Sequence, residues 1–222
     1  MTCFFTSSGP GPENGLMEEL KKELQTPCAA LYICSDPEGW ERTELYGGIN
    51  RALLEEAGIS FSSFQFLDSR NESSARAMVR EADFVILAGG HVPTQNRFFA
   101  KIGLRELLGG FDGVLMGISA GTMNSAEIVY AHPELPGEAV SETYKRFLPG
   151  LGLTKCMVLP HYQLIKGDVL DGLRLFEDIA YPDSMGRCFH VLPDGSYILS
   201  RDGQEELRGE AWLLCDGKLK KV

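Results

Sequence analysis

The segment 113–124 constrains the fold of this chain more than any other stretch. Its first half is a short apolar run without charge and has the length of a strand, and its second half places Ser119 among small residues before a segment that can be helical. We therefore predict a strand, a sharp turn and a helix, with Ser119 at the turn. The small neighbours Gly117, Ala120 and Gly121 would let the backbone pack closely around a serine whose hydroxyl projects from the sheet edge.

Such a turn suits acyl-transfer chemistry. The free N–H groups at the start of the helix would point to the space above Ser119, where a negatively charged oxygen forms during acyl transfer, and the Ala120 amide would be a natural donor to it. The pattern Gly-x-Ser-x-Gly also occurs by chance. Such a turn can also have a purely structural role, in which it lets a helix pack closely on a sheet. The other strand ends must therefore be considered.

Length and charge define the general class of the protein. With 222 residues, 44% of them hydrophobic, the chain suits one α/β domain spanning 1–222. The formal net charge is −10, and no basic run is longer than Lys220-Lys221, which argues against nucleic acid or membrane partners. We expect a small soluble substrate as the partner.

The cysteines and the N-terminus suggest a location. The six cysteines are scattered without a CxxC pair or a Cys/His cluster, which is typical of buried thiols in a reducing compartment rather than of a disulfide framework or a zinc site. The first residues lack the basic region and long apolar core of a signal peptide, and no stretch has the length of a membrane span. We expect a cytoplasmic protein.

Strands and helices are predicted to alternate along the chain from residue 2 to residue 180. Strands are expected at 2–7, 28–34, 60–67, 84–88 and 156–159, and helices at 16–24, 40–57, 72–82, 93–108 and 168–180. This alternation favours a doubly wound, mostly parallel sheet with helices on both faces. The segment 130–152 is predicted to be a loop over the site, and Asp-Gly pairs predict hairpins in a C-terminal β-meander at about 188–222.

Three predicted strand ends carry residues that suit catalysis, namely Gly89-Gly90, Ser119 and His161. Ligands of parallel sheets bind beyond these ends, and a serine needs an imidazole as its base. His161 is the best candidate, His91 could contact the substrate instead, and His132 and His190 have the settings of structural or surface histidines.

A carboxylate should hold the base in its tautomer. Glu134 and Glu138 lie in the loop between Ser119 and His161, and we favour Glu134, although either could be a solvated acid on an acidic chain. The Gly89-Gly90 pair could donate a second amide to the oxyanion, or it could be a plain turn.

These residues resemble a known family. Gly89-Gly90, the stretch Gly117-Ile118-Ser119-Ala120-Gly121 and Leu159-Pro160-His161-Tyr162 are similar to the three signature sites of the peptidase E and cyanophycinase family of serine peptidases. The resemblance implies a fold like that of flavodoxin and the class I glutamine amidotransferases. It also implies Ser119 as nucleophile, His161 as base, an acid between them, an oxyanion hole formed by Gly90 and Ala120, and no metal or organic cofactor.

The chain also departs from that family. His91 stands where members often have Asn, and Thr122-Met123-Asn124 stand where members have small residues. The family cleaves aspartyl dipeptides or the β-aspartyl-arginine links of cyanophycin, and an aspartyl carboxylate calls for a cation such as Arg97 or Lys166. Neither belongs to a matching motif.

Several functions are compatible with this pattern. We favour a serine-type peptidase that hydrolyses short peptides through an acyl-enzyme. The alternatives are a non-catalytic amidotransferase-like scaffold that binds a small molecule or a partner, and an esterase of the α/β-hydrolase type. A glutamine amidotransferase is disfavoured because its nucleophile would be a cysteine at the position of Ser119. Exposed apolar residues in the meander could support a homodimer.

Overall fold

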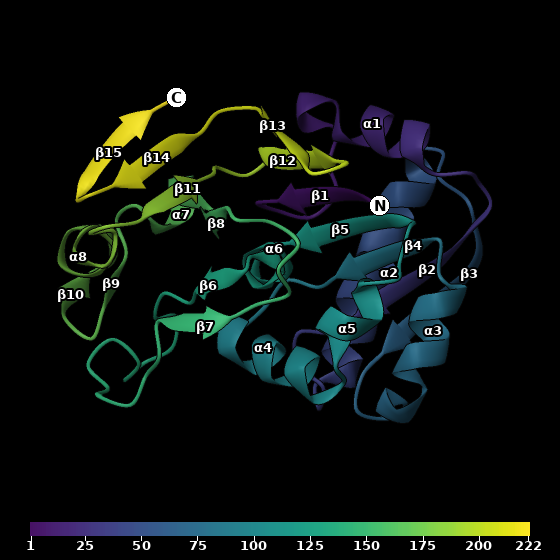
Figure 1. Ribbon diagram of the computed structural model, residues 1–222, viewed down its shortest axis with the longest axis horizontal. Helices are drawn as coiled ribbons and strands as arrows, with labels where there is room; N and C mark the ends of the chain where they lie inside the picture. The colour runs from purple at the N-terminus through teal and green to yellow at the C-terminus, as the bar shows by residue number, and fades with distance from the viewer.

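The structure is a computed structural model that describes residues 1–222, and a seven-stranded sheet forms its centre (Figure 1). The order is β13 (Gln204–Arg208), β12 (Tyr197–Arg201), β1 (Thr2–Thr6), β5 (Val114–Ile118), β4 (Phe84–Leu87), β2 (Cys28–Ile33) and β3 (Phe61–Leu67). The five strands from β1 to β3 are mutually parallel, β12 pairs antiparallel with β1, and β13 pairs antiparallel with β12. The predicted doubly wound, mostly parallel sheet is confirmed.

Helices cover both faces of this sheet. The helices α1 (Leu16–Glu23) and α2 (Trp40–Glu56) pack on one face, where Phe4 of β1 lies in a cluster of 18 buried residues. The helices α3 (Ala75–Glu81), α4 (Val92–Lys101) and α5 (Leu104–Leu108) pack on the other face, where Phe5 lies in a cluster of 20. The side chains of successive residues in a buried strand thus pack into the cores on opposite faces of the sheet, which explains why the sequences of these strands are continuously apolar.

A second sheet lies beside the first and is made from the later part of the chain (Figure 1). Its order is β15 (Lys218–Lys221), β14 (Trp212–Cys215), β11 (Cys188–Val191) and β8 (Met157–Leu159), with β8 parallel to β11. The predicted C-terminal meander is therefore divided: β12 and β13 join the central sheet, whereas β11, β14 and β15 join β8. The prediction of a single flanking meander was wrong because local turn signals do not determine which sheet a hairpin joins.

Two of the predicted helices are corrected. The segment 93–108 forms two helices, α4 and α5, because Gly103 adopts a φ of 64° between them. The segment 168–180 begins as a hairpin of β9 (Val169–Leu170) and β10 (Leu173–Arg174), turning at Asp171 and Gly172, and continues as the π-helix η3 (Leu175–Ala180). Both Asp171 and Gly172 have positive φ, so the Asp-Gly hairpin signal outweighs the helical spacing of the leucines.

The shorter elements connect these layers. They are η1 (Glu13–Gly15), η2 (Glu72–Ser74), α6 (Ala120–Ser125), α7 (Tyr162–Ile165) and α8 (Tyr181–Asp183), together with the antiparallel pair β6 (Ile128–Tyr130) and β7 (Phe147–Pro149). The strand β7 lies inside the segment 130–152 that was predicted as a loop and pairs with β6, which ends at Tyr130, so the irregular part between the two strands is 131–146. None of the helices is long and apolar enough to cross a membrane.

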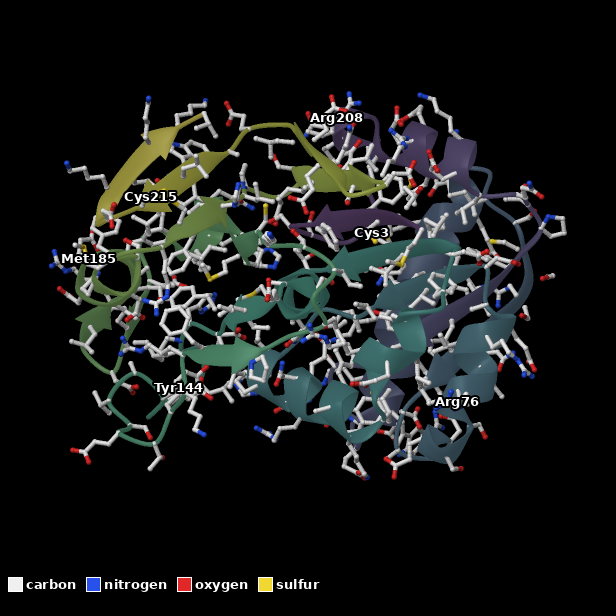
Figure 2. All side chains as sticks on the ribbon, in the orientation of Figure 1. Cys3, Arg76, Tyr144, Met185, Arg208 and Cys215 are labelled. Carbon is white, nitrogen blue, oxygen red and sulfur yellow. A yellow bond between two sulfur atoms is a disulfide. The ribbon has the colours of Figure 1, made fainter.

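The cysteines also depart from the prediction. Cys188 and Cys215 stand directly opposite each other on β11 and β14 and form a disulfide, and Cys215 is labelled at the edge of this sheet in Figure 2. Cys3, Cys28, Cys34 and Cys156 are free. The sequence analysis expected six free thiols. It missed the disulfide because the two cysteines are 27 residues apart, and no local sequence signal shows that their strands pair.

The glycine pair in the middle of α2 provides a test of this packing. A Cβ at Gly47 would collide with the ring of Phe66 on β3, whereas a Cβ at Gly48 would meet nothing within 4 Å. We expect Gly48→Ala to raise the free energy of unfolding by about 0.5–1 kcal/mol, because alanine is the better helix residue. Gly47→Ala should lower it instead. Urea unfolding of both variants checks this, and equal effects would show that Gly47 does not contact Phe66.

Candidate active site

Ser119 occupies the turn between β5 and α6 with a φ of 49° and a ψ of −107°. A non-glycine residue in this conformation is strained, and the surroundings hold it in place. The Ser119 amide donates to the Thr6 carbonyl at 3.1 Å, and the Thr122 hydroxyl lies 2.8 Å from the carbonyls of both Thr6 and Gly117. The predicted strand, sharp turn and helix are all present at 113–124.

The two glycines that flank Ser119 are required for close approach. A Cβ at Gly117 would lie 2.8 Å from the Thr122 amide nitrogen, and a Cβ at Gly121 would collide with the Leu87 carbonyl on β4. Each glycine therefore removes a clash that any other residue would create. The close packing of this turn therefore requires both glycines of the Gly-x-Ser-x-Gly motif, so the motif is more than a chance match.

His161 follows β8 and faces Ser119 across the sheet edge. Its Nε2 lies 2.8 Å from the Ser119 Oγ, and its Nδ1 lies 2.6 Å from the Asp194 Oδ1. Because a carboxylate can only accept, Nδ1 carries the proton and Nε2 is free to accept the serine hydroxyl. His161 has a φ of 60°, so both residues of this contact stand in the left-handed half of backbone space. The three side chains form a Ser-His-Asp arrangement that can withdraw the Ser119 proton.

The structure corrects the choice of the acid. Glu134 and Glu138 make no hydrogen bond to His161, and the carboxylate of Glu138 instead accepts the amides of Glu134 and Leu135 at 2.9 Å. Asp194 takes their place from the turn between β11 and β12, so the chain order is Ser, His, Asp. Sequence reasoning used Asp194-Gly195 only as a turn signal. The available hint was that Asp194 follows the apolar residues Val191 and Leu192 closely, as a residue at a strand end would.

Residues at the end of β1 hold the base and the acid together. The Ser7 hydroxyl accepts the His161 amide at 2.8 Å and lies 3.1 Å from the Leu192 carbonyl and 3.3 Å from Asp194 Oδ1. The Asp194 amide donates to Gln163 Oε1 at 2.9 Å. Sequence analysis missed Ser7, because a serine just after a strand is common in any protein.

The Gly89-Gly90 turn lies against the nucleophile. A Cβ at Gly89 would be 3.5 Å from the Ser119 Cβ. Gly90 has a φ of 149°, and a Cβ at this position would collide with the Ser35 side chain. Ala120 is the first residue of α6, where a backbone N–H has no intrahelical acceptor. The Gly90 and Ala120 amides have no acceptor among the hydrogen bonds of the loops and caps. The two amides are thus free to donate beside Ser119.

Of the other residues considered in the sequence analysis, some lie near Ser119 and some lie away from it. His91 lies near the site, but both ring nitrogens are engaged, with Glu138 Oε1 at 2.9 Å and Thr94 Oγ1 at 2.8 Å. Arg97 bonds to Thr94 at 3.2 Å and, like Lys166, lines neither pocket that contains Ser119. His190 packs on β11, where burial lowers its pKa.

Two pockets meet at Ser119 and His161. The first, which we call the α2 pocket, has a volume of about 660 Å³ and extends from Gly89 and Gly90 to Arg42 and Asn50 on α2. The second, which we call the loop pocket, has a volume of about 230 Å³ and lies under the loop 131–146. Arg42 was missed by sequence analysis, because the helical pattern gives no sign that its outer face borders a pocket.

Glu134 lines the loop pocket and has an unusual pKa. The residue is exposed to solvent, and partial desolvation of its carboxyl group in the pocket, together with the charge of Glu138, raises its pKa to about 8. Burial also lowers the pKa of His132, whose side chain is 7% exposed. Both groups are therefore expected to be neutral near pH 7. No group of three or more His, Cys, Asp or Glu side chains is arranged to hold a metal ion.

The fold and the site geometry define an α/β protein of the peptidase E and flavodoxin-like fold class. The structure resembles the 1.5 Å crystal structure of a Listeria monocytogenes EGD-e protein proposed to be a peptidase E, with a TM-score of 0.64 and 16% sequence identity. The similarity covers 93% of this chain and 97% of the other. No protein-family model matches the chain, and no curated protein is similar to it in sequence.

The raised pKa of Glu134 predicts a pH dependence of stability. Between the ordinary pKa of 4.5 and the folded-state value of about 8, the folded chain holds a proton that the unfolded chain has released. This contribution to the free energy of unfolding is therefore present below pH 4.5 and is lost as the pH rises through 8. Glu134→Gln should remove the dependence, so the variant gains stability relative to wild type from pH 5 to pH 9 in urea unfolding. A constant difference would contradict the raised pKa.

Proposed function

We propose that this chain is a serine peptidase that hydrolyses short peptides through an acyl-enzyme on Ser119. The observation that carries the proposal is the pair of contacts at His161, 2.8 Å from Ser119 and 2.6 Å from Asp194. The structural similarity to a protein proposed to be a peptidase E supports it. Membership of the peptidase E and cyanophycinase family is part of the same proposal.

The proposed reaction follows the geometry. The Ser119 hydroxyl attacks the peptide carbonyl while His161 Nε2 takes its proton, and Asp194 stabilises the imidazolium that forms. The carbonyl oxygen gains the negative charge, which the Gly90 and Ala120 amides would receive. The C–N bond then breaks as His161 returns the proton to the leaving amine, and water releases the acyl group by the same steps in reverse.

The α2 pocket suggests which peptides to test. Its volume of about 660 Å³ suits a small ligand, and Arg42 is the one Lys or Arg side chain among its lining residues. Arg42 forms no ion pair, so it is the available cation for an acidic substrate group, in the role for which Arg97 was expected. Aspartyl dipeptides are therefore the first substrates to test.

The nucleophile can be tested without knowing the substrate. We expect intact-mass analysis to show a single fluorophosphonate adduct on the wild-type protein and none on Ser119→Ala or His161→Ala, because both the serine and its base are needed. Ser125→Ala is the matched control, because this serine lies on α6 and bonds to the Gly121 carbonyl instead. An adduct that persists in Ser119→Ala would refute the assignment, and an unreactive wild type would favour the non-catalytic scaffold.

The acid can be tested separately from the nucleophile. Asp194→Asn should lower kcat on a cleaved dipeptide by about 10⁴-fold, since the amide would hold the imidazole in the wrong tautomer. Asp202→Asn changes an aspartate in the turn at the other end of β12, away from His161, and should leave kcat unchanged. If Glu134→Gln rather than Asp194→Asn abolished turnover, the loop acid would be the partner of His161 after all.

A further inference from the structure

The loop pocket is a second compartment of the site, on the side of Ser119 away from α2. Ser119 and His161 form part of its wall, and the loop 131–146, α7 and the β9–β10 hairpin form much of the rest. Its volume of about 230 Å³ equals that of roughly eight water molecules at about 30 Å³ each. The space suits one amino-acid side chain rather than a further stretch of peptide.

The walls of this pocket are aliphatic. Met123, Ile165, Leu170 and Leu175 line it, and no Phe, Tyr, Trp, Lys or Arg side chain does. Met123 and Leu175 are almost fully buried, so this part of the wall is fixed by the core. A flexible hydrocarbon stem would lose water and contact these residues on entering.

Three polar residues of the pocket, Glu134, Asp168 and His132, each have an acceptor atom without a hydrogen-bond partner in the chain. The carboxyl groups of Glu134 and Asp168 line it and form no hydrogen bond or ion pair with the chain. His132 is 93% buried, and its Nδ1 is bonded to the Pro133 carbonyl at 3.3 Å. Because a carbonyl only accepts, Nδ1 carries the proton, and Nε2 of this neutral ring is an acceptor that no group in the chain satisfies.

We propose that the loop pocket is a subsite for a substrate side chain with an unbranched aliphatic stem and a terminal ammonium group, as in lysine or ornithine. This inference rests on the proposed function, because Ser119 is what makes the pocket part of a reaction site. The proposed subsite differs from the expectation of an aspartyl group, which the Asp168 carboxyl group would repel in this pocket.

The chemistry of an ammonium group matches the acceptors. It has three N–H donors and one positive charge, and the pocket offers three acceptor groups, in Glu134, Asp168 and His132, with no competing cation. An arriving cation also favours the ionised form of Glu134, whose pKa is raised to about 8 in the empty pocket. The stem would lie along Ile165, Leu170 and Leu175.

Binding to Ser119→Ala tests the subsite without requiring turnover. The probes are N-acetyl-lysine amide, N-acetyl-norleucine amide, which lacks the ammonium, and norleucine amide, which carries an α-ammonium on the same stem. We expect calorimetry to show the lysine probe binding about 10- to 100-fold more tightly than N-acetyl-norleucine amide, as hydrogen bonds to a charged group allow. Methyl resonances of Ile165, Leu170 and Leu175 should shift only with probes that bind.

Variants of two glutamates test whether the preference for the lysine probe arises in the loop pocket. Glu134→Gln should reduce the affinity for the lysine probe toward that for N-acetyl-norleucine amide, whereas Glu142→Gln, on the same loop but outside the pocket, should have no effect. Equal affinities for the two acetylated probes, or no binding of either, would overturn the proposal, and a preference for norleucine amide would assign the pocket to an α-ammonium instead. A wild type that fails to react with fluorophosphonate would count against the peptidase proposal alone.

Discussion

The position of β1 between β5 and β12 is the constraint on which the site depends. Its parallel pairing with β5 brings the Thr6 carbonyl to the Ser119 amide, and its antiparallel pairing with β12 brings the 193–195 turn to the same edge. Ser7, the next residue of the chain, then bonds to the His161 amide. One short strand thus supports nucleophile, base and acid, and a shift in its register would separate them.

The site is held by contacts that oppose local backbone preference. Ser119 and His161 both have positive φ, which costs on the order of 1–3 kcal/mol for each residue. Thr122, Ser7 and Gln163 provide the opposing hydrogen bonds, each from a different element. The two side chains face each other because the surrounding fold outweighs their preference for ordinary backbone angles.

Sequence reasoning identified the central sheet and the contact of Ser119 with His161, because apolar strands and small residues around a turn are local signals. It failed for Asp194, since the choice of acid depends on β11 pairing with β8, which are separated by about 30 residues of chain. The segment 168–180 failed for another reason: Leu170, Leu173 and Phe176 have helical spacing, but Asp171-Gly172 favours a hairpin. Pairing between distant strands limited the prediction of the acid, and competition between local signals limited the prediction of the segment 168–180.

The late position of Asp194 has a consequence for how the protein matures. Ser119 and His161 are made before the chain reaches β11 and β12, whereas Asp194 reaches His161 only when β12 has been added beside β1. During synthesis, a partly emerged chain would contain the serine and its base without the carboxylate that orients them. The proposed hydrolytic centre is therefore complete only when the last strands of the central sheet have paired.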